Sequence, residues 1–525
     1  MHPFFNRTAP IRGLAWRRTA AALGVLCAAP LAWSQHVLTQ ATAEQFARTS
    51  FPEYLQFVAL PSESSKAADI VRNADWLTQA FAKRGFATRQ LPNEGKPLVY
   101  AELPARKATA ATKTVLFYMH FDAQPVTPSE WKTEPWTPTL RLRDAAGQWQ
   151  TLPLEQLQST PFNPEWRVFA RASADDKAPI VMFLAAIDAL RAAQVDPAMH
   201  IKVLLDSEEE KGSPRLHLVM QDNQTLLQSD GLIVYDGAMP PSNEPSINFG
   251  NRGSMQLDLT VFGPMSAQHS GVYGNVIPNP AQRLASLLAG MKDEDGKVVL
   301  PGFYDRISLT DAERAQVEAS SQPAAAILKR LGIAALEPTV RSPLLAMQFP
   351  SLDILGLSAG QVGTKAANAI PAAATASLNI RTVPETPPQR MHTLVRQYVQ
   401  SRGYHLIEGE TPTAEERSRY DKLARLGVIA YPSSASAARV PMESALAQWT
   451  LQGVRAPRGK DPEKIRMWGS TLPMSGAVDV LKQSYIVVPL VNADNNQHGP
   501  DENMRMGNYV EGIRTIASML TTPLP

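Results

Sequence analysis

Short apolar segments alternate with amphipathic helical patterns along the chain. The apolar segments lie at 114–119, 201–205, 232–235 and 485–491. They are as short as strands and show little polar alternation, which is typical of strands covered on both faces. Between two of them, residues 178–193 place apolar side chains at i, i+3 and i+4 spacing along one helix face. This alternation predicts an α/β fold with a mixed, largely parallel sheet and helices on both faces.

The middle of the chain has a different pattern. At 255–261 and again at 374–380, apolar residues alternate with polar ones, as in strands of an antiparallel sheet with one buried face. An apolar stripe at 391–398 predicts a helix that covers such a sheet. The middle segment is therefore expected to be a separate α+β unit.

A chain of 525 residues is too long for one ordinary domain. We expect an α/β domain built from two separate segments, 35–246 and 413–525. The α+β unit, at 247–412, would be inserted between them. Within the insert, residues 292–338 are expected to form an excursion.

The first 34 residues have the features of an export signal. A positively charged region is followed by a short apolar run at 20–31 and by small residues placed for cleavage before Gln35. The run is shorter than the ~20 residues of a membrane span. We therefore expect a secreted, periplasmic protein with no stable membrane association after cleavage. Arg17 and Arg18 leave a twin-arginine export route open.

Cysteine content and charge exclude several classes of function. The single cysteine, Cys27, lies within the expected signal segment, so the mature chain would have no disulfide, thiolate ligand or cysteine nucleophile. The formal net charge is +2, and no basic stripe with interleaved aromatic residues occurs. A nucleic-acid partner is therefore not expected.

Each predicted buried strand leads into acidic residues or a histidine. These are His120 and Asp122, then Asp206 with Glu208 to Glu210, then Asp236, and finally His498 after a polar loop. Taken singly, each has an ordinary explanation, such as a hydrogen-bonded loop pair or a solvated acidic surface. Together they would meet at the carboxyl edge of the sheet, where crowded carboxylates repel one another unless a cation is bound. The pattern therefore predicts a metal site.

Seven motifs, in order along the chain, carry a more specific resemblance. They lie at 119–122, 171–177, 209–213, 268–271, 368–371 with 381–384, 469–473, and 497–502. With them the sequence resembles the carnosinase, aminoacylase and glutamate-carboxypeptidase family of dinuclear zinc peptidases. Residues 295–304 further resemble the carnosinase-like dipeptidase branch. The resemblance implies a zinc-peptidase catalytic domain with an inserted lid and dimerisation domain.

The same resemblance implies a set of five metal ligands. His120 and Asp236 would bind one divalent ion, Glu210 and His498 would bind a second, and Asp175 would bridge the two. Imidazole and carboxylate ligands suit zinc, with manganese or cobalt as possible substitutes.

Two further acidic residues would assist the metals. Asp122 would hold the ring of His120 in its metal-binding tautomer. Glu209 would take a proton from the bridging water and pass it to the leaving amine.

The inserted domain would supply groups that contact the substrate. His269 and Asn368 would reach the site from the partner subunit of a homodimer, with His269 stabilising the oxyanion. Arg381 would bind a substrate carboxylate, and Ser470 would contact the substrate from a loop.

The chain departs from the family pattern around the bridging aspartate. Ala170, Ala172 and Ala178 stand where the family usually has glycine. Because alanine resists a positive φ angle, we expect the geometry of this loop or its metal affinity to differ.

The resemblance implies metal-dependent hydrolysis of a peptide bond in dipeptides or short peptides with a free C-terminal carboxylate. A metal-bridging hydroxide would attack, and Glu209 would act as general base and acid. An N-acyl amino-acid amidohydrolase with the same metal core is the alternative. A non-catalytic binding module would be expected to have lost Glu209 or a ligand, and a dinuclear phosphoesterase would lack His269 and Arg381.

Overall fold

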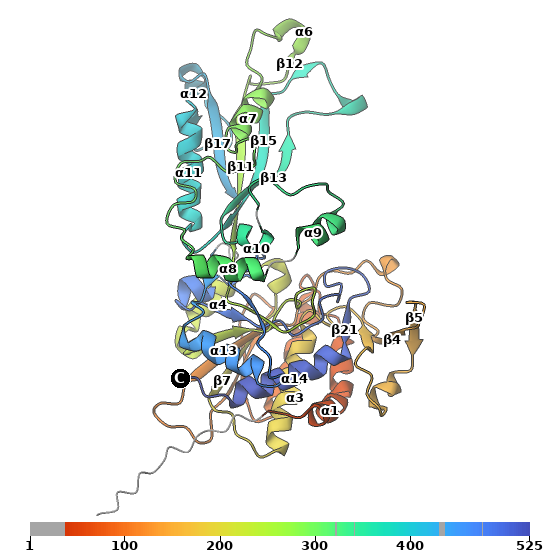
Figure 1. Cartoon of the computed structure of the whole chain (residues 1–525). Coiled ribbons are helices and arrows are strands. Elements are labelled where there is room, and N and C mark those ends of the chain that lie inside the picture. The colour runs from red at the N-terminus through yellow and green to blue at the C-terminus, as the bar shows by residue number, and fades with distance from the viewer. Residues whose placement is uncertain (1–36, 321–322, 341, 430–435, 475) are drawn as a thin grey trace, which may run out of the picture.

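The larger of two domains is built on an eight-stranded sheet (Figure 1). The computed structural model describes residues 37–320, 323–340, 342–429, 436–474 and 476–525. Four central strands, β7, β3, β8 and β20, run parallel to their neighbours within that group, and antiparallel strands flank them. The predicted mixed, largely parallel sheet is therefore confirmed. In spatial order the strands are β1 (Ala87–Leu91), β2 (Leu98–Leu103), β7 (His200–Asp206), β3 (Thr114–His120), β8 (Gly231–Val234), β20 (Ile486–Val487), β9 (Ser246–Asn248) and β19 (Glu463–Ile465).

Helices cover both faces of this sheet, which explains its apolar strands. In β3, Phe117 and Met119 enter one hydrophobic core, whereas Leu116 and Tyr118 enter another on the opposite face. Strands buried on both sides carry apolar residues at successive positions. The first core also contains α1 (Gln40–Val58), α2 (Ala67–Ala82), α3 (Lys177–Ala192), α13 (Ala445–Arg455) and α14 (Met506–Thr521), and the second contains α4 (Leu216–Asp222).

The inserted domain is built on a five-stranded sheet that rises from the main domain (Figure 1). Its two long strands pair antiparallel from Gly253↔Thr382 to Phe262↔Ala373. Alternate residues of β11 are buried, as the sequence pattern predicts. The strands, in spatial order, are β13 (Ser351–Ser358), β15 (Ala373–Thr382), β11 (Gly253–Phe262), β17 (Leu423–Ile429) and β16 (His405–Leu406), and α7 (Pro280–Ala289) and α11 (Pro388–Ser401) share their core.

The inserted domain extends beyond residue 412, where the sequence pattern placed its end. Strand β17 pairs with β11 from Gln256↔Ile429 to Phe262↔Leu423, so the sheet is complete only at residue 429. The short strands β10 (Gly250–Asn251) and β18 (Ala438–Arg439) then pair where the chain enters and leaves this domain. The pairing of β17 joins residues about 165 positions apart, which a local pattern does not reveal.

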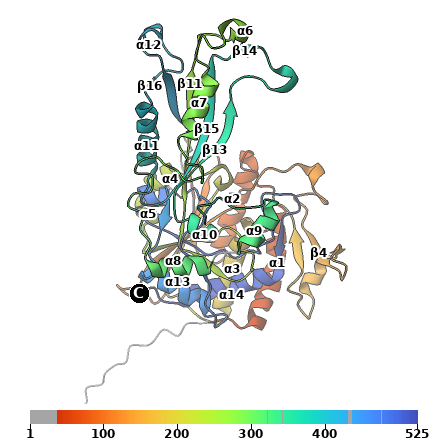
Figure 2. The ribbon, with the colours of Figure 1, turned by 45° about the horizontal axis from the view of Figure 1, so that its top comes forward.

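The excursion within the insert contacts both domains: Val298, Leu300 and Phe303 at its start join the core of the inserted sheet, whereas its later part lies against the main domain. The excursion carries α8 (Asp311–Ala319) and α9 (Ala324–Leu331), and α10 (Pro343–Ala346) follows it; these helices lie at the junction of the domains (Figure 2). Val317 and Leu344 share a core with Ile465 of β19. Arg466 forms an ion pair with Glu313 at 3.0 Å. The excursion therefore connects the two domains.

The expected signal segment, with Cys27, lies outside the described residues. Among the helices that are described, none has the length and apolar character needed to cross a membrane.

Candidate metal centre

The five predicted metal ligands converge at one edge of the main sheet. His120 ends β3, Asp236 follows β8, and Glu210 lies in a short 3₁₀ helix, Glu209–Lys211, after β7. Asp175 precedes α3, and His498 lies in the loop before β21 (Asn503–Arg505). Because parallel strands end at the same edge, residues far apart in the sequence come together here.

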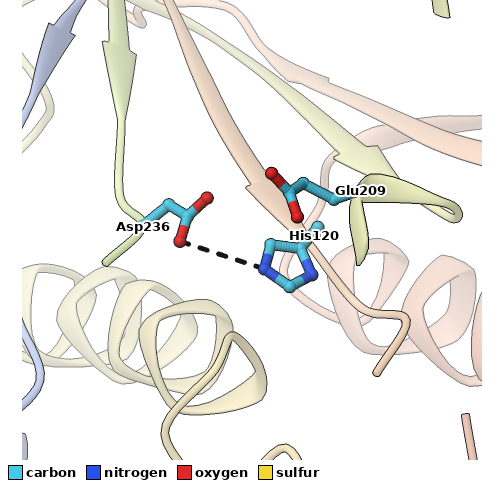
Figure 3. Close-up of side chains that lie close together, drawn as sticks. All are labelled: His120, Glu209 and Asp236. Carbon is cyan, nitrogen blue, oxygen red and sulfur yellow. Dashed lines mark ion pairs between the residues drawn. The ribbon is translucent and has the colours of Figure 1, made fainter. Parts of the chain in front are cut away.

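The side chains form two adjacent groups. In the first, the Nε2 atom of His120 lies 2.9 Å from Oδ1 of Asp175. The same atom lies 4.0 Å from Oδ1 of Asp236, the contact that is dashed in Figure 3. In the second, the Nε2 atom of His498 lies 3.1 Å from Oδ2 of Asp175 and 3.1 Å from Oε2 of Glu210. Asp175 thus presents one oxygen to each histidine, which is the arrangement that a carboxylate shared by two ions requires.

The chemistry of these groups fits two divalent cations. Ligand atoms of His120, Glu209 and Asp236 lie within 4.8 Å of one another, and so do those of Asp175, Glu210 and His498. Each group combines imidazole nitrogen with carboxylate oxygen, as zinc sites do. Glu209, predicted as the proton-transfer group, therefore lies beside the first group (Figure 3).

The titration behaviour of the site reflects crowded negative charge. Burial raises the pKa of Asp236 to about 6, and burial with the nearby Asp236 raises the pKa of Glu209 well above its usual range. Hydrogen bonds with Asp175 and Glu210 raise the pKa of His498 to about 11. Burial acts against ionisation of Asp175, yet hydrogen bonds from both histidines hold its pKa below its usual range. A site of this kind favours positive charge, whether from protons or from metal ions.

Asp122 connects His120 to the glutamate loop. Its two oxygens accept hydrogen bonds from the backbone N–H groups of Glu209 at 3.0 Å and Glu210 at 3.1 Å. Its Oδ1 atom lies 3.4 Å from Nδ1 of His120. This position suits the predicted role of orienting the His120 ring.

Asp206, the last residue of β7, and Glu208, just after it, hydrogen-bond within the loop and are not part of the two metal-ligand groups. Asp206 accepts hydrogen bonds from the Tyr118 hydroxyl at 2.8 Å and the Ser213 hydroxyl at 2.5 Å. Glu208 accepts one from Asn93 at 3.0 Å and pairs with Lys96. These contacts anchor the segment that carries Glu209 and Glu210.

Glu502 holds the loop that carries Asp175, a role that the sequence reasoning missed. It is 1% exposed and accepts hydrogen bonds from the backbone N–H groups of Ala172 at 3.0 Å, Ala174 at 2.9 Å and Asp175 at 3.0 Å. Arg171 donates to the same carboxylate at 2.9 Å. The only sequence signal for this role was the place of Glu502 at the end of the motif at 497–502. The contact itself depends on the pairing of β21 with β6 (Arg167–Phe169), which brings the two segments together.

Of the three alanines that replace family glycines, only Ala172 has a positive φ angle, at 59°. Ala178 lies in α3, where alanine is favourable. The departure from the family pattern therefore places backbone strain at one residue of the loop.

Within one chain, His269 and Asn368 lie far from these ligands. His269 is in β12 (Gln268–His269), which pairs with β14 (Ala369–Ile370), and the backbone N–H of Ser270 donates to the carbonyl of Asn368 at 2.9 Å. Both β12 and α6 (Ser270–Tyr273) lie at the end of the inserted domain remote from the main domain (Figure 1). The structure brings the two predicted residues together, but away from the metal ligands of their own chain.

Arg381 contacts the loop that carries Ser470 at the domain junction. The Nη1 atom of Arg381 donates to the hydroxyl of Thr471 at 2.6 Å, next to Ser470. Asn251 lies 3.4 Å from the Ser470 hydroxyl. The two predicted substrate contacts therefore belong to one group.

Comparison with known proteins confirms the resemblance found in the motifs. The family description "peptidase dimerisation domain" of the M20 type matches residues 249–406. Beta-Ala-His dipeptidase of Mus musculus is 25% identical over 86% of this chain and 85% of its own. Cys-Gly metallodipeptidase of Candida albicans is 26% identical over 90% of this chain and 94% of its own.

Solved structures show the same two-domain fold. An M20 family metallo-carboxypeptidase from Sulfolobus solfataricus has a TM-score of 0.70 at 25% identity, covering 90% of this chain and 98% of that one. Human carnosine dipeptidase 1 has a TM-score of 0.66 at 20% identity, covering 92% and 98%. The predicted fold and the prediction of a metallopeptidase-type enzyme are thereby confirmed.

Substitution of Glu502 tests the support of the metal loop. Glu502→Gln should lower the free energy of unfolding by about 3–5 kcal/mol, because Arg171 would lose its buried partner. Metal affinity should fall about 10- to 100-fold as the Asp175 loop loosens. Denaturant unfolding and metal titration would measure both. Glu165→Gln, at an exposed pair with Arg505, is the control and should behave as wild type; equal stability of both variants would contradict the role of Glu502.

Proposed function

We propose that this chain, as an M20-type metallopeptidase, hydrolyses dipeptides or short peptides that have a free C-terminal carboxylate. The observation that carries the proposal is the Asp175 carboxylate, whose two oxygens lie against His120 and His498 in adjacent ligand groups. The relatives named Beta-Ala-His dipeptidase and Cys-Gly metallodipeptidase support a dipeptide substrate.

Two divalent ions, zinc in our proposal, would be held by His120, Asp175, Glu210, Asp236 and His498 and would supply Lewis-acid activation of a water molecule and of the scissile carbonyl. Glu209 lies beside the first ligand group with a raised pKa. A carboxylate in that position can accept the proton of the attacking water and return it to the leaving amine. Asp122 fixes the backbone of Glu209, so the proton acceptor is held in place.

The enzyme would act as a homodimer through the inserted domain. Strand β13 is an edge strand of its sheet, and it exposes Ile354, Leu355 and Leu357 by 47%, 60% and 65%. An apolar edge with unpaired backbone groups favours association with another chain. The matched dimerisation domain includes this strand.

Dimerisation would also complete the active site. Strand β12, which carries His269 and lies next to Asn368, is at the end of the inserted domain remote from the main domain (Figure 1), which supports a role for both residues in the site of the partner subunit. His269 would stabilise the oxyanion there. Arg381, directed to the loop with Ser470 and Thr471, would bind the C-terminal carboxylate of the substrate.

An N-acyl amino-acid amidohydrolase would use the same metal core and the same carboxylate contact. A panel of dipeptides and N-acyl amino acids distinguishes the two reactions. Metal-reconstituted protein should bind close to two metal ions per chain, hydrolyse dipeptides faster, and lose activity with a chelator. Metal analysis and amine release would measure this. Hydrolysis that survives removal of all transition metal would refute the proposal, and faster cleavage of N-acyl amino acids would favour the alternative.

We also propose export and cleavage of the N-terminal segment. The charged region, short apolar run and small residues before Gln35 are its basis. The mature protein, isolated from the periplasm of a Gram-negative expression host, should begin near Gln35. N-terminal sequencing of exported protein that still contains Arg17 and Arg18 would rule out this cleavage.

Mixed dimers test the contribution of each subunit. Glu209→Gln should lower kcat about 10²- to 10⁴-fold with both metals retained. His269→Ala should lower kcat about 10²- to 10³-fold, far more than it raises KM. In a mixed dimer of the two variants one active site has both residues, so activity should return to a substantial fraction of wild type.

Subunit exchange would be verified with differently tagged chains, and each parent dimer would be checked for folding and metal content. Exchanged dimers that remain as inactive as their parents would show that His269 does not act across the interface.

A further inference from the structure

Two arginines lie next to each other at the junction of the domains. Arg381 is near the end of β15, where Thr382 pairs with Gly253. Arg252 immediately precedes Gly253, so the two guanidinium-bearing residues leave neighbouring strands at the same level of the sheet. Both are half-buried.

Both guanidinium groups are directed at one loop of the main domain. Arg381 donates to the hydroxyl of Thr471 at 2.6 Å, and Nε of Arg252 lies 3.4 Å from the carbonyl oxygen of Gly469. At Gly469 a side-chain Cβ would lie 3.4 Å from Nη2 of Arg252. Arg252 therefore belongs to the same group as the proposed substrate contacts Arg381 and Ser470.

Neither arginine has a carboxylate of its own. Among the described residues, no acidic oxygen lies within 4.0 Å of either guanidinium group, whereas Arg466 and Arg439 at the same junction pair with Glu313 and Glu385. The contrast shows that this chain pairs its other arginines in this region and leaves these two open to an external anion.

In the part of the chain that the structure describes, the one acid that acts on both arginines electrostatically, Asp353, has other partners. Asp353 attracts both arginines, but it lies 3.4 Å from Nζ of Lys292 and accepts a hydrogen bond from the Ser351 hydroxyl at 3.0 Å. Three cations thus share one carboxylate. Burial, followed by the repulsion from Arg381, lowers the pKa of Arg252 to about 10. A second anion in the substrate would offset the repulsion.

We propose that Arg252 determines specificity: while Arg381 binds the C-terminal carboxylate, Arg252 binds a second carboxylate on the side chain of the same residue, so dipeptides that end in aspartate or glutamate are preferred. A planar guanidinium group binds a carboxylate through two parallel hydrogen bonds, so two adjacent arginines suit a residue with two carboxylates. This inference rests on the proposed function and specifies its substrate class.

The test compares Ala-Glu with Ala-Gln, which has nearly the same shape but one carboxylate fewer. Metal-loaded wild-type enzyme should have a kcat/KM at least about 10-fold higher for Ala-Glu, because a hydrogen bond to a charged group contributes at about that level. Arg252→Gln should remove most of this preference by lowering kcat/KM for Ala-Glu and changing it little for Ala-Gln. Arg252→Lys keeps the charge and should retain part of the preference.

Metal content and thermal unfolding of each variant would show that it is folded. Wild-type enzyme that cleaves both dipeptides equally well would overturn the inference, and this holds even if a variant fails to fold. An equal loss on both dipeptides in Arg252→Gln would overturn it too, since Arg252 would then support only the structure or the common carboxylate. A protein that cleaves no dipeptide at all would instead refute the proposed function.

Discussion

The ion pairs of Asp175 with His120 and His498 are the interactions around which the site is arranged. Each histidine faces one oxygen of the Asp175 carboxylate. The carboxylate of Asp236 lies near His120, and that of Glu210 lies near His498. Concentrating so much negative charge in a largely buried place costs free energy unless cations are bound. The surrounding contacts of Glu502, Asp122 and Asp206 are hydrogen bonds that hold this unfavourable arrangement together before any substrate arrives.

The two domains differ in construction and in what they contribute to the site. The main sheet, covered by helices on both faces, is a rigid support that brings four strand ends to one edge. The inserted sheet has an exposed edge at β13, and its far end, with β12 and α6, lies away from the main domain (Figure 1). The excursion with α8 and α9, together with α10 just after it, joins the domains through Val317, Leu344 and the Arg466–Glu313 pair. The junction also holds Arg252 and Arg381, where a substrate would contact both domains.

Several features could not be predicted from local sequence. The extent of the inserted domain depends on the pairing of β17 with β11, and the role of Glu502 depends on the pairing of β21 with β6. Both are contacts between segments far apart in the chain, and neither leaves a periodic signal. The effect of the alanines near Asp175 likewise required the backbone angles, since only Ala172 has a positive φ.

The resemblance of the motifs to the family implied the complete set of five ligands, with Asp175 as the bridge, and the role of Glu209. The periodicity of the sequence by itself determined the class of the fold and placed His120, Glu210, Asp236 and His498 after predicted strands. Strand and helix periodicity is local, and residues that follow parallel strands must meet at one edge, so these features can be read without coordinates. Only the tertiary structure decided which oxygen of Asp175 faces which histidine, that His269 and Asn368 lie together but remote from their own site, and that Arg252 lies beside Arg381 without a carboxylate partner. These facts depend on long-range packing and on the position of one domain against the other, which local chemistry does not specify.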